Sequence, residues 1–86
     1  MTNPDPFSAI ADPNRRYILE VLRREPKTVN DLAKQLPISR PAVSQHLKAL
    51  LDCNLVSVQS EGTKRIYHIH RPGFDRMNLW LDQFWS

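Results

Sequence analysis

Apolar residues recur every three or four positions along the chain, in short segments that prolines separate. Because the residue before a proline avoids helical geometry, the prolines mark the expected ends of helices. This pattern predicts a brief first helix over 4–11, with Phe7 and Ile10 as its apolar residues. A second helix is predicted to begin at Asp12-Pro13, a cap followed by proline at the first helical position, and to extend to the next proline.

Two helices joined by a short turn are predicted next, over about 28–52. Thr28 and Asp31 have the spacing of a capping box, with Asp in place of the usual Glu, and open the first of these helices. Ser39 is the expected cap of the second helix, which runs to about Asp52 and has a buried seam at i, i+4 and i+7: Val43, Leu47 and Leu50. Two short helices with a turn of about three residues between them are typical of a helix-turn-helix.

A hairpin and a last helix complete the predicted fold. The residues on both sides of Glu61-Gly62-Thr63, over about 55–70, are rich in β-branched and apolar types, which is typical of a β-hairpin. A hairpin directly after a helix-turn-helix forms the wing of a winged helix, and 74–85 then has the pattern of an amphipathic helix. We therefore expect one domain over 1–86, mainly α with a small β-hairpin (α+β): a winged helix-turn-helix.

The distribution of charge along the chain is more informative about the partner than the net charge. The 86 residues carry a formal charge of +3, which is too small to indicate a nucleic-acid partner. Residues 34–71, however, hold six basic side chains against two acidic ones, a balance of +4, while the rest of the chain sums to −1. Positive charge thus gathers on the predicted helix-turn-helix and wing, which favours double-stranded DNA as the partner.

The helix predicted after Ser39 presents polar side chains whose chemistry suits DNA. Its outward face near the N-terminus is the part of a recognition helix that meets base edges in the major groove. Gln can bond adenine, Arg can bond guanine, and Ser can bond a base or a phosphate, while cations at the wing tip suit the minor groove or the backbone. The predicted DNA-binding residues are Ser39, Arg40, Pro41, Ser44, Gln45, His46, Lys48, Thr63, Lys64 and Arg65.

Other roles stay open for several of these residues. Gln45 and Lys48 could be ordinary solvated side chains, and a lysine at a hairpin edge often serves to prevent edge pairing. His46 lies beside the buried seam, so both a packing or capping role and a phosphate contact stay open. The same face could bind a protein, which makes a winged-helix protein-interaction module the alternative to a DNA-binding regulator.

Catalysis has little support in this sequence. Ser44 and His46 are two positions apart and point in different directions on a helix, Cys53 has no evident base, and no glycine-rich phosphate loop exists. We expect no catalytic residue and no enzymatic activity. No apolar run could span a membrane and the single cysteine cannot form an internal disulfide, so we expect a cytoplasmic protein without a membrane partner.

The last predicted helix is unusually aromatic for so short a chain. Phe74 and five further apolar residues fall within an arc of about 140° on a helical wheel, while Leu79 projects from the other side. One small domain is expected to share such a surface with a second copy. The predicted homodimer interface, which includes residues of the first helix, consists of Phe7, Ile10, Met77, Trp80, Leu81, Phe84 and Trp85.

In these motifs the chain resembles the arsenic-repressor (ArsR) family of small winged-helix transcriptional regulators. The matching stretches are Phe7-Ser-Ala-Ile-Ala-Asp-Pro-Asn-Arg15 with Ile18-Leu19, Leu32-Ala-Lys-Gln-Leu36, Ser39-Arg-Pro-Ala-Val-Ser-Gln-His-Leu47 with Leu50, Asn54-Leu-Val, and Glu61-Gly-Thr-Lys-Arg with Tyr67. The resemblance implies a homodimer joined through its first and last helices, which represses from an inverted-repeat operator until a signal arrives. It also implies a structural role for Arg15.

Many members of that family sense metals, but this chain lacks the family's ligand patterns. No Cys-x-Cys occurs near Asn30, and no histidine follows His70. His68 and His70 share one face of a predicted strand, yet a zinc site normally needs three or four protein ligands. We expect no metal and no cofactor, which is typical of a metal-independent branch; a metal- or redox-responsive repressor, the latter through Cys53, is the alternative.

Overall fold

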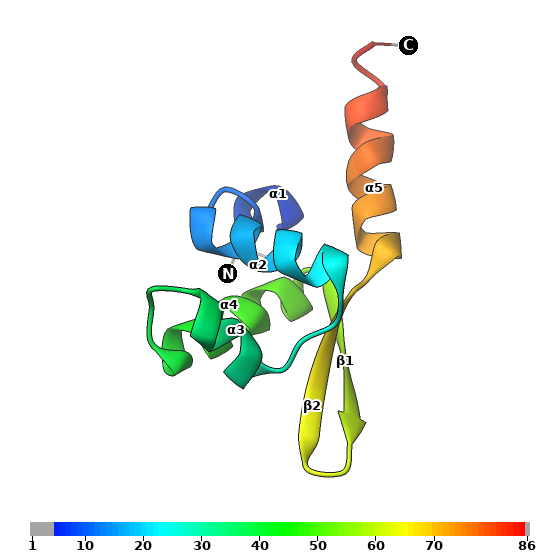
Figure 1. Cartoon of the computed structure of the whole chain (residues 1–86). Helices are drawn as coiled ribbons and strands as arrows, with labels where there is room; N and C mark the ends of the chain where they lie inside the picture. The colour runs from blue at the N-terminus through cyan, green and yellow to red at the C-terminus, as the bar shows by residue number, and fades with distance from the viewer. Residues whose placement is uncertain (1–4, 86) are drawn as a thin grey trace.

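The computed structural model describes residues 5–85, in which five helices and a two-stranded antiparallel sheet follow one another (Figure 1). In chain order the elements are α1 (Pro6–Ala9), α2 (Pro13–Arg24), α3 (Val29–Gln35), α4 (Arg40–Asp52), β1 (Val56–Glu61), β2 (Lys64–Ile69) and α5 (Arg71–Asp82). This architecture confirms the predicted winged helix-turn-helix. The start of the helix predicted over 4–11 lies outside the described residues, and within them α1 has four residues.

Side-chain caps begin the helices of the helix-turn-helix as the sequence predicts. Thr28 and Asp31 form the capping box at α3, in which the Asp31 amide donates to Thr28 Oγ1 over 3.2 Å. Ser39 Oγ accepts a hydrogen bond of 3.3 Å from the Ala42 amide at the start of α4, and Asp12 caps α2 in the same way. Each such cap is worth about 1 kcal/mol, so these side chains define where α3 and α4 begin.

The core lies where α2, α3 and α4 meet the base of the wing. All three residues of the predicted seam of α4, Val43, Leu47 and Leu50, are completely buried. They pack in one cluster with residues from the neighbouring elements, among them Ile18, Leu32 and Leu55. Burial of one such side chain stabilises the fold by about 1.5–3 kcal/mol. The inner face of α4 thus anchors the helix, which leaves its polar face free.

The wing is a tight hairpin. β1 and β2 pair in antiparallel register up to Glu61 and Lys64, so only Gly62 and Thr63 form the turn. Gly62 has φ +60° at the first of the two central positions, where a type II′ turn requires glycine. Glu61, which the sequence suggested as a turn residue, belongs to the strand. The short turn places the cations that follow it at the tip of the wing.

A backbone bridge fastens the wing to the helix-turn-helix. Tyr67 of β2 exchanges two hydrogen bonds with Lys27, which lies just before α3: the Tyr67 amide donates over 2.8 Å and the Lys27 amide over 3.2 Å. The Tyr67 side chain is buried in the core. This bridge ties the middle of the wing to the segment just before α3.

The last helix differs from the prediction at both ends. It was expected over 74–85, but α5 begins at Arg71 and ends at Asp82. Proline is tolerated in the first turn of a helix because the amide it lacks would have no partner there, so Pro72 lies inside α5 rather than before it. Beyond the helix, the Phe84 amide donates to the Leu81 carbonyl in a final turn.

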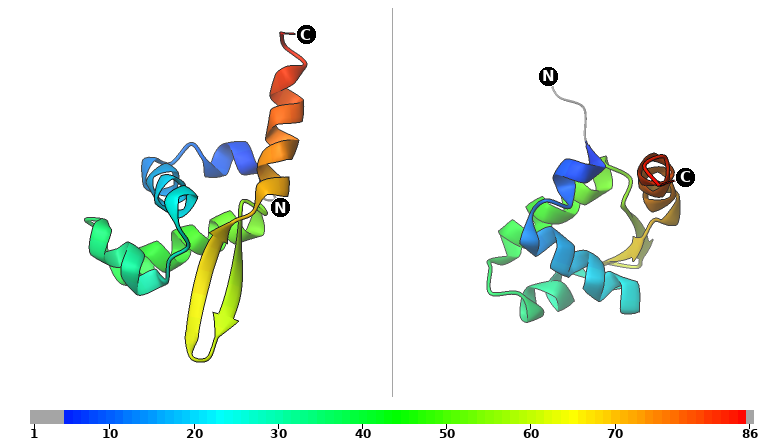
Figure 2. Two further views of the ribbon diagram at one scale, coloured as in Figure 1. Left: turned by 45° about the vertical axis from the view of Figure 1, so that its right-hand side comes forward. Right: turned by 90° about the horizontal axis from the view of Figure 1, so that it is seen from above.

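Helix α5 projects from the body of the molecule beside α1, with its C-terminal end far from the wing tip (Figures 1 and 2). The Phe7 ring of α1 lies 5.1 Å from the Trp80 ring, and Trp80 lies 4.7 Å from Phe84. Met77 differs from the prediction, which placed it on the dimer surface. The base of α5 packs on the core and leaves Met77 only 6% exposed. Its side chain is covered within one chain.

Candidate nucleic-acid interface

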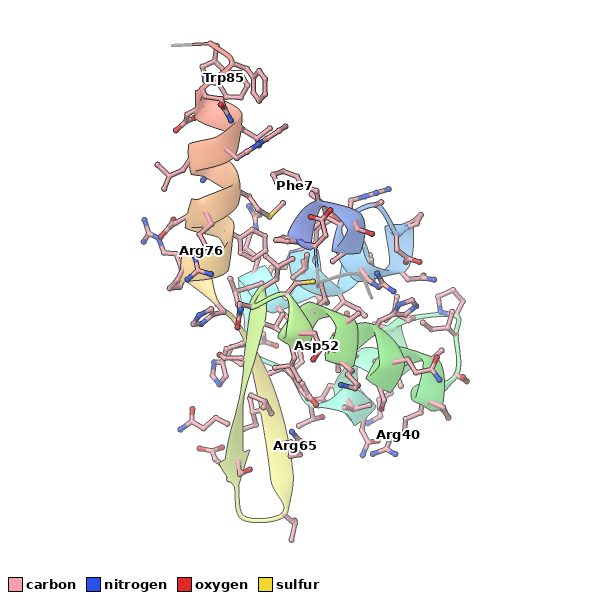
Figure 3. The ribbon with its side chains drawn as sticks, turned by 180° about the vertical axis from the view of Figure 1, so that it is seen from behind. Phe7, Arg40, Asp52, Arg65, Arg76 and Trp85 are labelled. Atoms are coloured by element: carbon pink, nitrogen blue, oxygen red, sulfur yellow. The ribbon has the colours of Figure 1, made fainter. Side chains whose placement is uncertain are left out.

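A concavity between the helix-turn-helix and the wing brings together residues that are far apart in the sequence. Its volume is about 900 Å³, and α3, α4, the turn of the wing and β2 contribute to its wall. The predicted DNA-binding residues that line it are Arg40, Ser44, Lys48, Thr63, Lys64 and Arg65. Figure 3 shows Arg40 and Arg65 together at the end of the molecule opposite to Trp85. Recognition helix and wing therefore form one continuous surface.

The other predicted residues lie outside this lining. Pro41 and Gln45 are exposed on α4, and Ser39 is exposed just before it. Gln45 follows Ser44 on the polar face of α4, so both side chains are accessible to a partner that enters the concavity. His46 is half-buried and turned toward α2.

The positive charge of the concavity is largely uncompensated. Within residues 5–85, no carboxylate oxygen lies within 4.0 Å of a basic nitrogen of Arg40, Lys64 or Arg65. Lys48 differs, because its Nζ lies 3.3 Å from Asp52 Oδ2 one turn along α4. Both side chains of that pair are exposed, and exposed pairs contribute little stability, so Lys48 can exchange Asp52 for a phosphate.

Asp31 places one carboxylate in the wall of this basic concavity. Its Oδ2 accepts a hydrogen bond from the Thr28 amide, and its own amide donates to the Thr28 hydroxyl. The hydrogen bonds with Thr28 lower the pKa of Asp31 below its usual value. The carboxylate is thus held by the start of α3 rather than by the arginine and lysines around it.

Arg40 is held by the facing helix. Its Nε donates a hydrogen bond of 2.6 Å to Oδ1 of Asn30 in α3, and both side chains are exposed in the concavity. Sequence reasoning did not identify Asn30, because the contact depends on how α3 and α4 approach each other. The only local signal was a short polar side chain in the first turn of α3.

Arg15 makes a side-chain hydrogen bond to the recognition helix α4. Arg15 Nε donates to His46 Nδ1 over 3.2 Å, which joins the start of α2 to the recognition helix. Asp12 lies close by: burial raises its pKa, but hydrogen bonds from the amides of Arg15 and Asn14 and the nearby positive charges lower it more, and the net shift is downward. The bond to Arg15 is consistent with the packing role of His46, and its predicted contact with a phosphate stays a prediction.

The described part of the chain contains neither a cluster of metal ligands nor an activated cysteine. No group of three or more His, Cys, Asp or Glu side chains there could hold a metal ion. Burial raises the pKa of the Cys53 thiol, and Asp52 adds to the shift, so the unreactive thiol form prevails at neutral pH. Among residues 5–85 no helix is long and apolar enough to cross a membrane.

Comparison with known proteins identifies the family. Residues 12–58, which include α2, the helix-turn-helix and the start of the wing, match the model of the bacterial regulatory proteins of the ArsR family. The chain belongs to the ArsR family. It is therefore a DNA-binding transcriptional regulator and not an enzyme, as the sequence predicts.

Individual relatives are similar in sequence or structure to most of this chain. An HTH-type transcriptional regulator of Mycobacterium tuberculosis is 45% identical over 80 residues, which cover 93% of this chain and 75% of that protein. A probable mercury resistance operon repressor of Streptomyces lividans is 37% identical over 83% of this chain and 60% of its own length. A crystal structure described as a possible transcriptional regulator for arsenical resistance has a TM-score of 0.84 at 32% identity, and the match covers 100% of this chain and 88% of that one.

Proposed function

We propose that this ArsR-family protein is a homodimeric repressor that binds an inverted-repeat operator in double-stranded DNA. The N-terminal half of α4 enters the major groove, and the wing tip contacts the phosphate backbone or the minor groove. The protein acts in the cytoplasm and uses no metal or cofactor. Relatives that are named repressors support the first part of the proposal.

One observation carries the proposal: a single basic concavity contains both the start of the recognition helix and the wing tip. Arg40, Ser44 and the neighbouring Gln45 offer the donors and acceptors that base edges require. Lys48, Lys64 and Arg65 offer positive charge around them for phosphates. Phosphate contacts position a protein on the duplex, and base contacts select the sequence.

The exposed aromatic residues at the end of α5 and just beyond it support the dimer. Trp80, Phe84 and Trp85 are 51%, 63% and 71% exposed in the single chain. Aromatic residues in such numbers are typical of the central part of a protein interface. A two-fold axis near α5 would present two α4 helices on one side of a duplex, where successive major grooves lie about 34 Å apart.

The test measures binding of the full chain to duplexes by fluorescence anisotropy, after selection of a preferred sequence from a random library. Wild-type affinity should fall steeply with salt, and Lys64→Ala should reduce the slope of log K against log salt by about 1 for every sequence. Gln45→Ala should instead relax the preference for one base in each half-site, a loss of about 1–3 kcal/mol. Arg24→Ala is the matched control, since it removes one exposed charge of α2 outside the concavity.

Two results would contradict the proposal. Absence of detectable binding to any duplex at about 50 mM salt would favour the protein-interaction module, because phosphate contacts are strongest at low salt. An equal change of slope in Lys64→Ala and Arg24→Ala would show that DNA does not contact the concavity in particular.

A further inference from the structure

The contact between Asn30 and Arg40 joins two helices at the mouth of the concavity. Asn30 belongs to the first turn of α3 and Arg40 is the first residue of α4, so ten positions of chain separate them. The hydrogen bond of 2.6 Å is made by Nε, the inner nitrogen of the guanidinium group. Both residues are exposed, and both line the concavity.

Use of Nε leaves the outer edge of Arg40 free. A guanidinium group has five N–H donors in one rigid plane, of which Nε supplies one and the two terminal nitrogens supply four. Bidentate contact with O6 and N7 of guanine can use the two terminal nitrogens alone. A bond at Nε fixes the plane of the group, so less side-chain freedom remains to be lost when DNA binds.

The acceptor on α3 is a neutral amide, although a carboxylate lies next to it in the sequence. The Asp31 carboxylate accepts a hydrogen bond from the Thr28 amide, and the Asp31 amide donates to the Thr28 hydroxyl. No carboxylate among residues 5–85 lies within 4.0 Å of the Arg40 nitrogens. The amide of Asn30 therefore orients Arg40 without neutralising it. The full positive charge stays available to the electronegative edge of guanine.

We propose that Asn30 is a positioning residue that sets the base preference of this protein through Arg40. It holds the guanidinium plane so that the terminal nitrogens read one guanine in each half-site. Asn30 itself makes no base contact in this arrangement. The inference rests on the proposed function, since it assumes that α4 enters the major groove.

The experiment is a double-mutant cycle with the full chain and the selected duplex, together with duplexes in which each guanine is replaced in turn. Arg40→Ala should weaken binding to the selected duplex about 5- to 150-fold and abolish the preference at one guanine. Asn30→Ala should weaken the preference for that same guanine about 2- to 10-fold, as expected for the loss of one hydrogen bond. In the Arg40→Ala background, Asn30→Ala should have no further effect.

Two further variants separate positioning from a structural role. Asn30→Asp keeps the acceptor and adds a negative charge, so it should retain the guanine preference while it lowers affinity for all duplexes. Gln35→Ala removes an exposed amide from the same helix outside the concavity and should change neither property. Thermal unfolding of Asn30→Ala is measured in parallel to ensure that the compared proteins are folded.

The inference is overturned if Asn30→Ala weakens all duplexes equally, if it acts as strongly without Arg40, or if it has no effect. It is also overturned if Arg40→Ala reduces affinity for every sequence alike, because Arg40 would then contact a phosphate. These outcomes leave DNA binding itself intact. Failure of the wild-type protein to bind any duplex is a different result, which removes the proposed function and the inference with it.

Discussion

The two ends of this molecule differ in how completely one chain covers its own apolar surface. Around α3, α4 and the wing, the apolar faces meet one another, and residues such as Leu47 have no exposure. At the outer end of α5, Trp80 and Trp85 keep more than half of their surface exposed. The hydrophobic periodicity of α4 and α5 is similarly regular. Periodicity therefore shows that a helix has an apolar face, but not whether its own chain covers that face.

The largest expected effect is on the free energy of unfolding, at the end of the molecule where α3, α4 and the wing bury their apolar faces. Leu47→Ala removes a fully buried side chain from α4 and should lower the free energy of unfolding by about 2–5 kcal/mol. Leu79→Ala removes the same atoms from a residue that is 72% exposed, and it should change the free energy of unfolding by less than about 0.5 kcal/mol. Urea unfolding followed by circular dichroism measures both. Similar losses in the two variants would remove the distinction between the ends.

The next largest effect concerns the exposed aromatic residues at the outer end of α5. Trp80→Ala should raise the dissociation constant of the proposed dimer by a factor of about 30 or more, as for other central aromatic residues of interfaces. Sedimentation equilibrium measures this change against a wild-type mass near twice 10.0 kDa. Leu79→Ala is the control, since Leu79 projects from the other side of α5. A monomeric wild-type protein would contradict the dimer, and an equal effect of Leu79→Ala would move the interface to the opposite face.

The smallest effect concerns the charge at the DNA-facing end. The hydrogen bonds with Thr28 lower the pKa of Asp31, so the ionised carboxylate stabilises the folded state. This contribution is complete above the ordinary value of 3.8 and is lost as the pH falls through the lower value of the folded state. Asp31→Asn should therefore reduce the loss of stability between pH 5 and pH 2, as measured by urea unfolding at each pH. An unchanged pH dependence would show that the capping box does not depend on this charge.

Local features were predicted well from the sequence because their causes lie within a few residues. The capping box of Thr28 and Asp31 and the seam of α4 follow from spacing alone. The start of α5 was missed because Pro72 was treated as a boundary, although the first turn of a helix tolerates proline.

Contacts between distant segments could not be predicted in this way. The bridge between Lys27 and Tyr67 joins residues 40 positions apart, and the bond from Arg15 to His46 spans 31 positions. Neither pair has a sequence pattern, because each depends on the three-dimensional approach of elements that pack through other residues. The same holds for Asn30, so the candidate site was predicted as a set of chemical groups but not as an arrangement.

The close packing at Gly73 determines the direction in which α5 leaves the body of the molecule. A Cβ atom at this position would overlap the backbone carbonyl of Asn54, directly after the recognition helix. Helix α5 has 12 residues and is therefore about 18 Å long, so a tilt of about 10° at its base moves the far end by roughly 3 Å. In the proposed dimer joined through α5, the packing at Gly73 would therefore set the angle between α5 and the recognition helix. A side chain there would change the separation of the two recognition helices, and with it the half-site spacing that the dimer prefers, while every residue that reads a base stays the same.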